Sequence, residues 1–82
     1  MLVEILEVMD TDPVTVYDIY DALGYPCDSD GRYDYNRLND IRTGMSKLRR
    51  QGYVESCGKI TLMVPAMRRR MVASHVTVWR RL

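Results

Sequence analysis

The sequence predicts a single small α+β domain in which three helices precede a small antiparallel β-sheet. Apolar residues recur at helical spacing through residues 1–51, whereas the segment near the C-terminus alternates as a strand does. No linker rich in Pro, Gly or Ser divides the 82 residues, and a hydrophobic content of 46% is ordinary for a folded domain. We therefore expect one domain over residues 1–82, with a core of modest size.

The first helix is expected over residues 2–10. Its apolar residues have the spacing of one helix face, and they are Leu2, Ile5, Leu6 and Met9. Pro13 disfavours the helical conformation in the residue before it, so the helix ends before that point. Residues 13–15 are then expected as a short extended piece.

The second helix is expected over residues 16–23. Thr15 supplies an N-cap, and Asp18 stands three residues later, as in a variant of the capping box. Gly24 stops the helix. Residues 24–33 then form a polar loop rich in turn formers.

The third helix, expected over residues 35–51, has the clearest pattern in the chain. Asp34 is a good N-cap because its carboxylate accepts from the free N–H groups of the first turn, and Gly52 supplies a left-handed residue at the other end. One apolar stripe recurs at 3-4-3 spacing, and it consists of Leu38, Ile41, Met45 and Leu48. The opposite face is polar and cationic, with Asp40 near its edge, and it carries Asn36, Asn39, Thr43, Ser46, Lys47 and Arg50.

Three strands are expected after this helix, over residues 53–56, 59–64 and 75–81. A turn at residues 57–58 folds the second strand back on the first as a hairpin. The pairing of the last strand stays open. Either it pairs with the first strand, which makes residues 57–74 an enlarged basic excursion, or it adds a third strand to the hairpin.

The last strand alternates strictly along its length. One side carries Val76, Val78 and Arg80, and the other carries Thr77, Trp79 and Arg81. Trp79 is the only tryptophan of the chain. We expect it to pack in the core or at an interface, with base stacking as the alternative.

Charge is strongly divided along the chain, although the net charge is only +1. Residues 1–34 contain nine acidic side chains and one basic side chain, and residues 35–82 contain eleven basic and two acidic ones. This division predicts a basic face for a polyanion and an acidic back. The alternative is a pair of oppositely charged halves that attract each other within the fold.

Several classes of protein are disfavoured. No run reaches the roughly 18 apolar residues of a membrane span, and the N-terminus lacks a signal-peptide pattern, so we expect a cytoplasmic protein without a membrane partner. Cys27 and Cys57 match no metal or redox spacing, which indicates two reduced thiols, with a disulfide as the alternative. His75 is the single histidine. No arrangement of residues indicates a catalytic site, a metal or a cofactor, so we do not expect an enzyme.

The order of helix, extended piece, helix, loop, helix and strands resembles that of the winged helix-turn-helix family. Residues 13–24, PVTVYDIYDALG, look like the family's second-helix segment, and residues 36–54, NRLNDIRTGMSKLRRQGYV, look like its third helix running into the first wing strand. The resemblance covers residues 2–56 well and residues 57–82 loosely. The loop before the third helix is longer, and the wing larger, than the family's pattern. The small size is reminiscent of short phage regulators.

The resemblance implies a protein that binds double-stranded DNA sequence-specifically. Such a protein is expected to be a transcriptional regulator whose third helix lies in the major groove. Asn pairs bidentately with adenine, and Arg or Lys with guanine. The groove-facing residues implied are Asn36, Asn39, Thr43, Lys47 and Arg50. Arg42 and Arg49 flank this stripe and are expected at phosphates or in surface ion pairs. The basic wing is expected on the backbone or in a narrow minor groove, through Arg68, Arg69 and Arg70, with a solvated loop as the alternative.

These expectations define a set of candidate DNA-binding residues. They are Asn36, Asn39, Arg42, Thr43, Ser46, Lys47, Arg50, Arg68, Arg69 and Arg70. A homodimer on a pseudo-palindromic site is the geometric default for such proteins. A solvated helix face, a protein-interaction module that binds a partner on the acidic face, and an accessory factor in replication or recombination are the alternatives.

Overall fold

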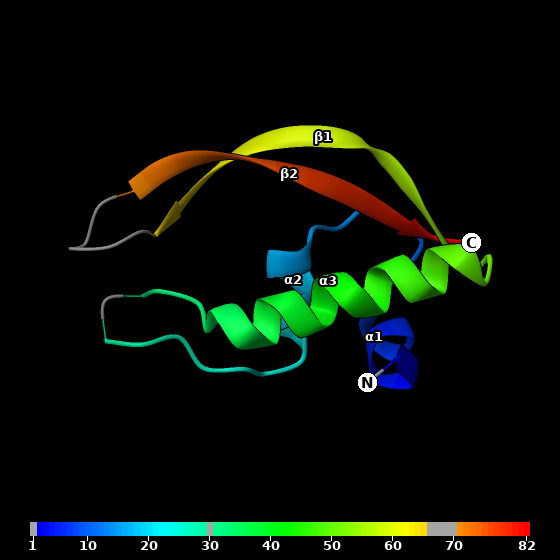
Figure 1. The fold of residues 1–82 in the computed structure, drawn as a ribbon, viewed down its shortest axis with the longest axis horizontal. Helices are drawn as coiled ribbons and strands as arrows, with labels where there is room; N and C mark the ends of the chain where they lie inside the picture. Colours follow the sequence, from blue (N-terminus) through cyan, green and yellow to red (C-terminus); the bar gives the residue numbers. More distant parts are fainter. Residues whose placement is uncertain (1, 30, 66–70) are drawn as a thin grey trace.

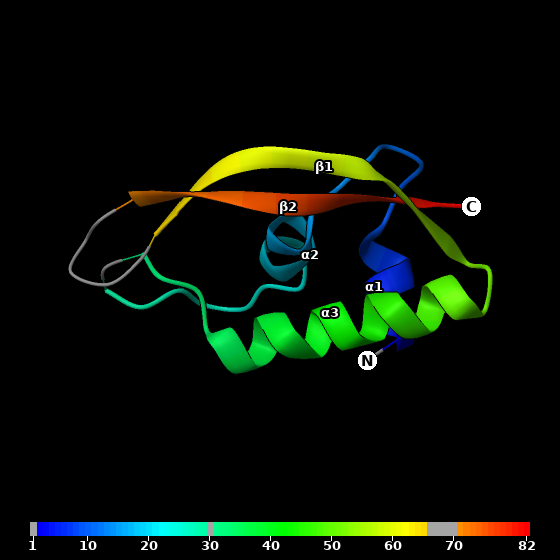
Figure 2. The same ribbon diagram turned by 45° about the horizontal axis from the view of Figure 1, so that its top comes forward.

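The computed structural model describes residues 2–29, 31–65 and 71–82. In chain order its elements are α1 (Leu2–Val8), α2 (Val16–Ala22), α3 (Tyr35–Arg50), β1 (Val54–Pro65) and β2 (Met71–Arg81). Three helices followed by a small antiparallel sheet confirm the predicted α+β class, in a layout consistent with a winged helix. The two strands arch over α3 as one long hairpin (Figure 1), and α3 runs beside the hairpin in both ribbon views (Figure 2).

The core lies where the helices meet the base of the hairpin. The apolar stripe of α3 is buried as its spacing predicts, with exposures of no more than 2% for Leu38, Ile41, Met45 and Leu48. Ile5 of α1 and Ile19 of α2 pack into the same cluster. None of the helices in the described part of the chain is long and apolar enough to cross a membrane.

Both predicted helix caps are present. The Thr15 hydroxyl accepts from the Asp18 N–H at 3.3 Å, and the Asp18 carboxylate accepts from the Thr15 N–H at 2.9 Å, which completes a capping box. The Asp34 carboxylate accepts from the Asn36 N–H at 2.9 Å at the start of α3. Gly52, with a φ of 83°, supplies the left-handed residue beyond the end of α3.

The loop between α2 and α3 is anchored on α2 through tyrosines. The hydroxyl of the fully buried Tyr20 donates to the Pro26 carbonyl at 2.6 Å and accepts from the Asp34 N–H at 3.1 Å. The Tyr33 ring stands edge-on to those of Tyr20 and Tyr17, with centroid distances of 4.9 and 4.8 Å. Because Asp34 caps α3, this cluster connects the loop to the first turn of that helix.

The sheet corrects the predicted strands. β1 and β2 pair along their length, from Val54 opposite Arg81 to Pro65 opposite Met71. The last predicted strand therefore pairs with the segment directly after α3, which was one of the two alternatives. The predicted turn at residues 57–58 is wrong, and so is the division of β1 into two strands.

The physical reason for the correction is a β-bulge. The register shifts between Ser56 and Lys59, and Gly58 adopts a φ of 105°. Glycine tolerates this conformation without steric cost, so the strand takes up an extra residue and continues instead of reversing. The alternative of an enlarged excursion over residues 57–74 is corrected in the same way. The described residues of this segment mostly form the outer part of one hairpin.

Burial along β2 departs from the expected alternation. Strict alternation puts Val76 and Trp79 on opposite faces, yet both are buried, with exposures of 6% and 9%. Trp79 packs in the core as expected. Its backbone N–H donates to the Val14 carbonyl at 2.7 Å, and its backbone carbonyl accepts from the Val14 N–H at 2.8 Å, in the predicted extended piece at 13–15.

Candidate nucleic-acid interface

The polar side of α3 is exposed, as the pattern predicts. Every candidate residue on this helix is exposed: Asn36, Asn39, Arg42, Thr43, Ser46, Lys47 and Arg50. None of them contributes to the apolar core. The other three candidates, Arg68, Arg69 and Arg70, lie outside the described residues.

The exposed side of α3 divides into two parts with different surroundings. At 100° per residue, five side chains point away from the buried stripe, and we call them the outer face: Asn36, Asn39, Thr43, Lys47 and Arg50. Arg42, Ser46 and Arg49 lie on the flank that turns toward the hairpin, where they line two cavities. The Arg42 guanidinium also donates to the Asn39 side-chain carbonyl at 3.2 Å, which joins the two parts.

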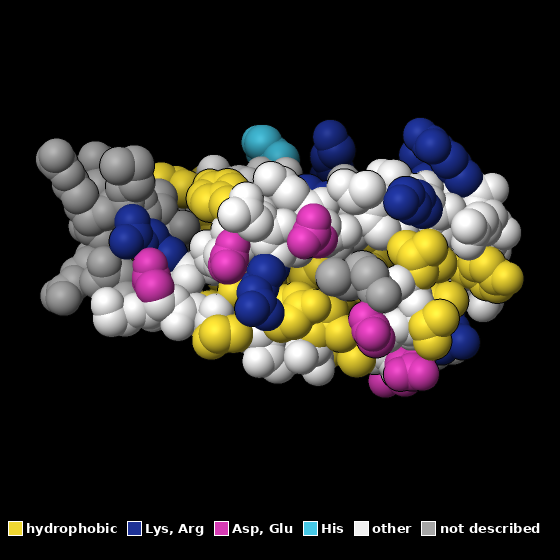
Figure 3. All heavy atoms as spheres, turned by 60° about the horizontal axis from the view of Figure 1, so that its bottom comes forward, with side chains coloured by type: hydrophobic (Ala, Val, Ile, Leu, Met, Phe, Trp, Pro, Cys, Tyr) yellow, Lys and Arg dark blue, Asp and Glu magenta, His cyan; other side chains and the backbone are white. Residues whose placement is uncertain are grey.

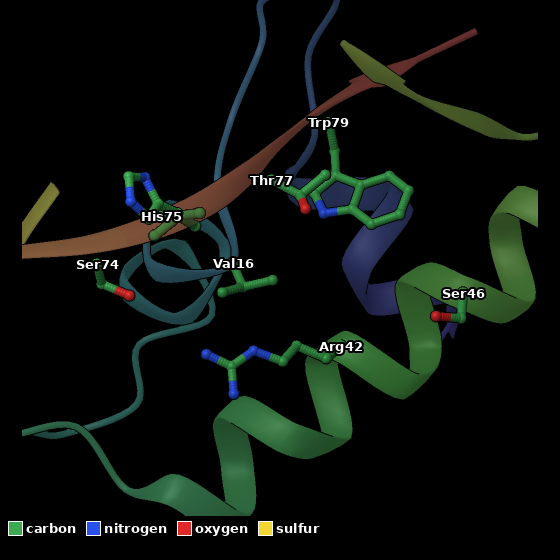
Figure 4. A pocket seen from close by; sticks show the side chains of 8 residues that line it. Val16, Arg42, Ser46, Ser74, His75, Thr77 and Trp79 are labelled. Carbon is green, nitrogen blue, oxygen red and sulfur yellow. The ribbon is translucent and has the colours of Figure 1, made fainter. Parts of the chain in front are cut away.

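The first cavity, of about 280 Å³, lies between α3 and the middle of β2. Figure 4 shows the Arg42 guanidinium reaching from α3 toward the side on which Ser74 lies, while the His75 ring turns away from it. The His75 Nδ1 is 3.2 Å from the hydroxyl of Thr61 on the neighbouring strand. The residues that line the cavity are Val16, Arg42, Ser46, Ser74, His75, Val76, Thr77 and Trp79.

The second cavity, of about 380 Å³, continues from the first toward the bulge. Both are lined by Ser46, Thr77 and Trp79, so they form one depression between α3 and the strands. We call it the α3–hairpin groove. Its further lining residues at this end are Arg49, Ser56, Gly58 and Lys59.

The lining of this groove suits a polyanion. Its charged residues are three cations, Arg42, Arg49 and Lys59, and none of the described residues that line it is acidic. Beyond Glu55 the chain contains no acidic residue at all, so the hairpin has no carboxylate past the start of β1. The groove therefore presents positive charge that no carboxylate on its walls offsets.

The ion pairs between described residues lie outside the groove. They include Arg32 with Asp28 at 3.0 Å, Arg37 with Asp34 at 3.7 Å, and Arg80 with Glu55 across the hairpin. Within the ranges that the structure describes, none involves the cations of the groove. Of these pairs, the one between Arg37 and Asp34 joins the acidic first 34 residues to the basic remainder.

The surface view shows both charge signs on one face. In Figure 3, Asp and Glu side chains lie at the left, in the middle and at the lower right of the face, and several Lys and Arg side chains project along its upper edge. Cations also appear beside carboxylates in the middle and at the left of this face.

Arg81 and the two cysteines lie outside the groove. The Arg81 guanidinium donates to the Leu6 carbonyl at 2.6 Å and so holds the end of β2 to α1. Cys27 and Cys57 are both free and exposed. Partial desolvation, with the nearby charges of Asp21 and Asp28, raises the pKa of the Cys27 thiol above its usual value. No group of three or more potential metal ligands occurs in residues 2–29, 31–65 and 71–82.

The groove contains residues that sequence analysis did not select. Ser56, Lys59 and Thr77 are predicted strand residues, and only the arrangement of the hairpin over α3 brings them opposite Arg49. One signal was available for Lys59, because it is the first cation in a segment without acids. The serine and threonine hydroxyls have no comparable signal, since such residues are common on strands.

Comparisons with models of protein families, with curated proteins and with solved structures gave no match to this chain.

Proposed function

We propose that this protein binds double-stranded DNA with sequence preference through the outer face of α3, as a cytoplasmic regulator of transcription. The observation that carries the proposal is a helix with one side buried and the other exposed, polar and cationic. This face stands beside a hairpin that lacks acids beyond its first residues. Together they form a mainly cationic surface, with Asp40 at its edge, that carries groups suited to base edges.

The dimensions of α3 agree with the proposal. An α-helix with its side chains is about 10–12 Å wide, and the major groove of B-DNA is about 12 Å wide. Asn36 and Asn39 supply amides for adenine, Lys47 and Arg50 supply cations for guanine, and the Thr43 methyl suits thymine. Each good bidentate pair contributes about 1–3 kcal/mol of discrimination.

The competing function is a protein-interaction module. α1 exposes Val3, at 67%, beside the exposed side chains of Glu4 and Glu7. An apolar residue among carboxylates on a short helix is a feature that a protein partner could use. This surface lies outside the outer face and the groove, so the two functions predict different mutational effects.

The test begins with selection of duplexes from a random pool, followed by fluorescence anisotropy on the selected duplex. A protein that neutralises about six phosphates loses roughly 10³-fold in affinity between 50 and 200 mM salt. Asn39→Ala and Arg50→Ala should lose preference between the selected and a scrambled duplex by about 5- to 150-fold, which corresponds to about 1–3 kcal/mol.

The matched control is Glu7→Gln, which changes one charge on the exposed surface of α1. It should leave the preference unchanged. If no duplex is enriched, or if Asn39→Ala and Arg50→Ala bind like the unaltered protein, DNA recognition by α3 is wrong. Loss of a protein partner on Glu7→Gln, together with indifference to Arg50→Ala, would establish the competing function.

A further inference from the structure

We propose that the α3–hairpin groove holds the sugar–phosphate backbone of one DNA strand. This inference rests on the proposed function and extends it. The outer face of α3 then reads bases, while the groove beside it holds one strand and fixes the position of the duplex.

The shape of the groove favours a chain-like ligand. Its two cavities, of about 280 and 380 Å³, share residues and follow one another between α3 and the hairpin. One wall is a helix flank, and the other is formed by β2 and the bulge of β1. A continuous depression between two elongated walls suits a linear polymer better than a compact metabolite.

The donors of the groove are arranged along its length. Arg42, Ser46 and Arg49 occupy one flank of α3, with rises of about 6 and 10.5 Å from the first to the second and third. One DNA strand carries a charge every 3.4 Å or so of helix axis, and its phosphates are farther apart along the strand itself, so a strand that follows this flank brings about two phosphates past it. Lys59 supplies a cation from the opposite wall.

Hydroxyl groups complete the polar lining. They come from Ser46 on α3 and from Ser56, Ser74 and Thr77 on the strands. Hydroxyls and cations are the side-chain groups that proteins use on phosphate oxygens, and such contacts set register without reading sequence. An acid-free lining with both kinds of donor is suited to a phosphodiester backbone.

The floor of the groove argues for backbone rather than base. Trp79 is only 9% exposed and Val76 only 6%. A base that stacks needs an accessible ring face, and the largely covered indole does not offer one. The floor therefore does not support stacking of a base in the groove.

The bulge leaves room for such a strand. Cys57 and Gly58 have no partner residue in the ladder between Ser56 and Lys59, and a bulged residue leaves peptide groups unused by the sheet. A Cβ atom built on Gly58 meets nothing within 4 Å. The open backbone at Gly58 can therefore approach a phosphate closely.

The first experiment measures the salt dependence of binding to the selected duplex by Arg49→Gln, Lys59→Gln and the double variant. Each lost phosphate contact should lower the slope of log K against log salt by about 0.9, with the preference for the selected over the scrambled duplex unchanged. Arg80→Gln is the control, because it removes a cation of the same hairpin that is paired with Glu55 and does not line the groove. Circular dichroism melts verify that each variant is folded.

The second experiment uses duplexes in which three consecutive phosphates of one strand are replaced by neutral methylphosphonates, moved stepwise along either strand. We expect one window on one strand to weaken the unaltered protein at least tenfold. The same window should have little effect on the Arg49→Gln/Lys59→Gln variant. The equivalent window on the other strand should have little effect on either protein.

The outcomes separate this inference from the proposed function. Normal salt slopes in both groove variants, with Asn39→Ala still losing preference, would overturn the groove and leave base reading by α3 intact. Binding of a single strand but of no duplex, with loss in the groove variants, would support the groove and overturn duplex reading. Absence of binding to any DNA would overturn both.

Discussion

Replacement of Tyr20 by phenylalanine tests how the recognition helix is held at its first turn. The Tyr20 side chain is fully buried, and its hydroxyl donates to the Pro26 carbonyl and accepts from the Asp34 N–H. Tyr20→Phe keeps the ring, and with it the edge-on contacts to Tyr25 and Tyr33. It removes only the atom that joins α2, the loop and the N-cap of α3.

The magnitude follows from the two hydrogen bonds. Each neutral hydrogen bond contributes about 0.5–1.5 kcal/mol net, so we expect the free energy of unfolding to fall by about 1–3 kcal/mol. In a domain of this size, 1 kcal/mol shifts the melting temperature by roughly 4–8 °C. A midrange loss of about 2 kcal/mol therefore lowers the melting temperature by roughly 8–16 °C.

Urea unfolding followed by circular dichroism measures this loss directly. Tyr53→Phe is the control, since that side chain is 52% exposed and removal of its hydroxyl changes the same atom type at the surface. The two variants should share the urea slope and differ in midpoint. A Tyr20→Phe midpoint equal to that of Tyr53→Phe would show that the bridge does not stabilise the fold, and the reasoning would fail.

Further predictions concern the cap, the bulge, one thiol and the oligomeric state. Asp34→Ala should cost about 1 kcal/mol in urea unfolding through loss of the α3 N-cap, and an unchanged midpoint would contradict this. Gly58→Ala should cost about 1–3 kcal/mol because the φ of 105° strains any side chain, and a neutral effect would mean that the bulge relaxes readily. In a Cys57→Ser background, alkylation of Cys27 should reach half its maximal rate at a higher pH in the folded than in the urea-unfolded protein, because the raised pKa moves thiolate formation to higher pH. Asp21→Asn should lower this midpoint pH in the folded protein. Equal midpoints in the folded and unfolded protein would refute the prediction. If the protein acts as a two-fold dimer, sedimentation on the selected duplex should show two copies on half-sites about 10 base pairs apart, whereas one copy on a single half-site would refute the dimer.

Local sequence was enough to locate the helices and their caps. The stripe from Leu38 to Leu48 and the capping residues Thr15 and Asp34 depend on neighbours three or four positions away. Such interactions are present in the one-dimensional pattern, so the exposed polar side of α3 could be anticipated as well. The division of charge between residues 1–34 and 35–82 was likewise evident from the sequence alone.

The course of the chain after α3 depended on partners distant in sequence. Residues 57–58 could either reverse the chain or form a bulge. The pairing of β1 with β2, whose Trp79 is more than twenty residues away in the sequence, decides between the two. The same pairing brings Val14 against β2 and sets Lys59 and Thr77 across from Arg49. The groove therefore exists only in the folded molecule, because its two walls come from segments whose local patterns say nothing about their separation in space.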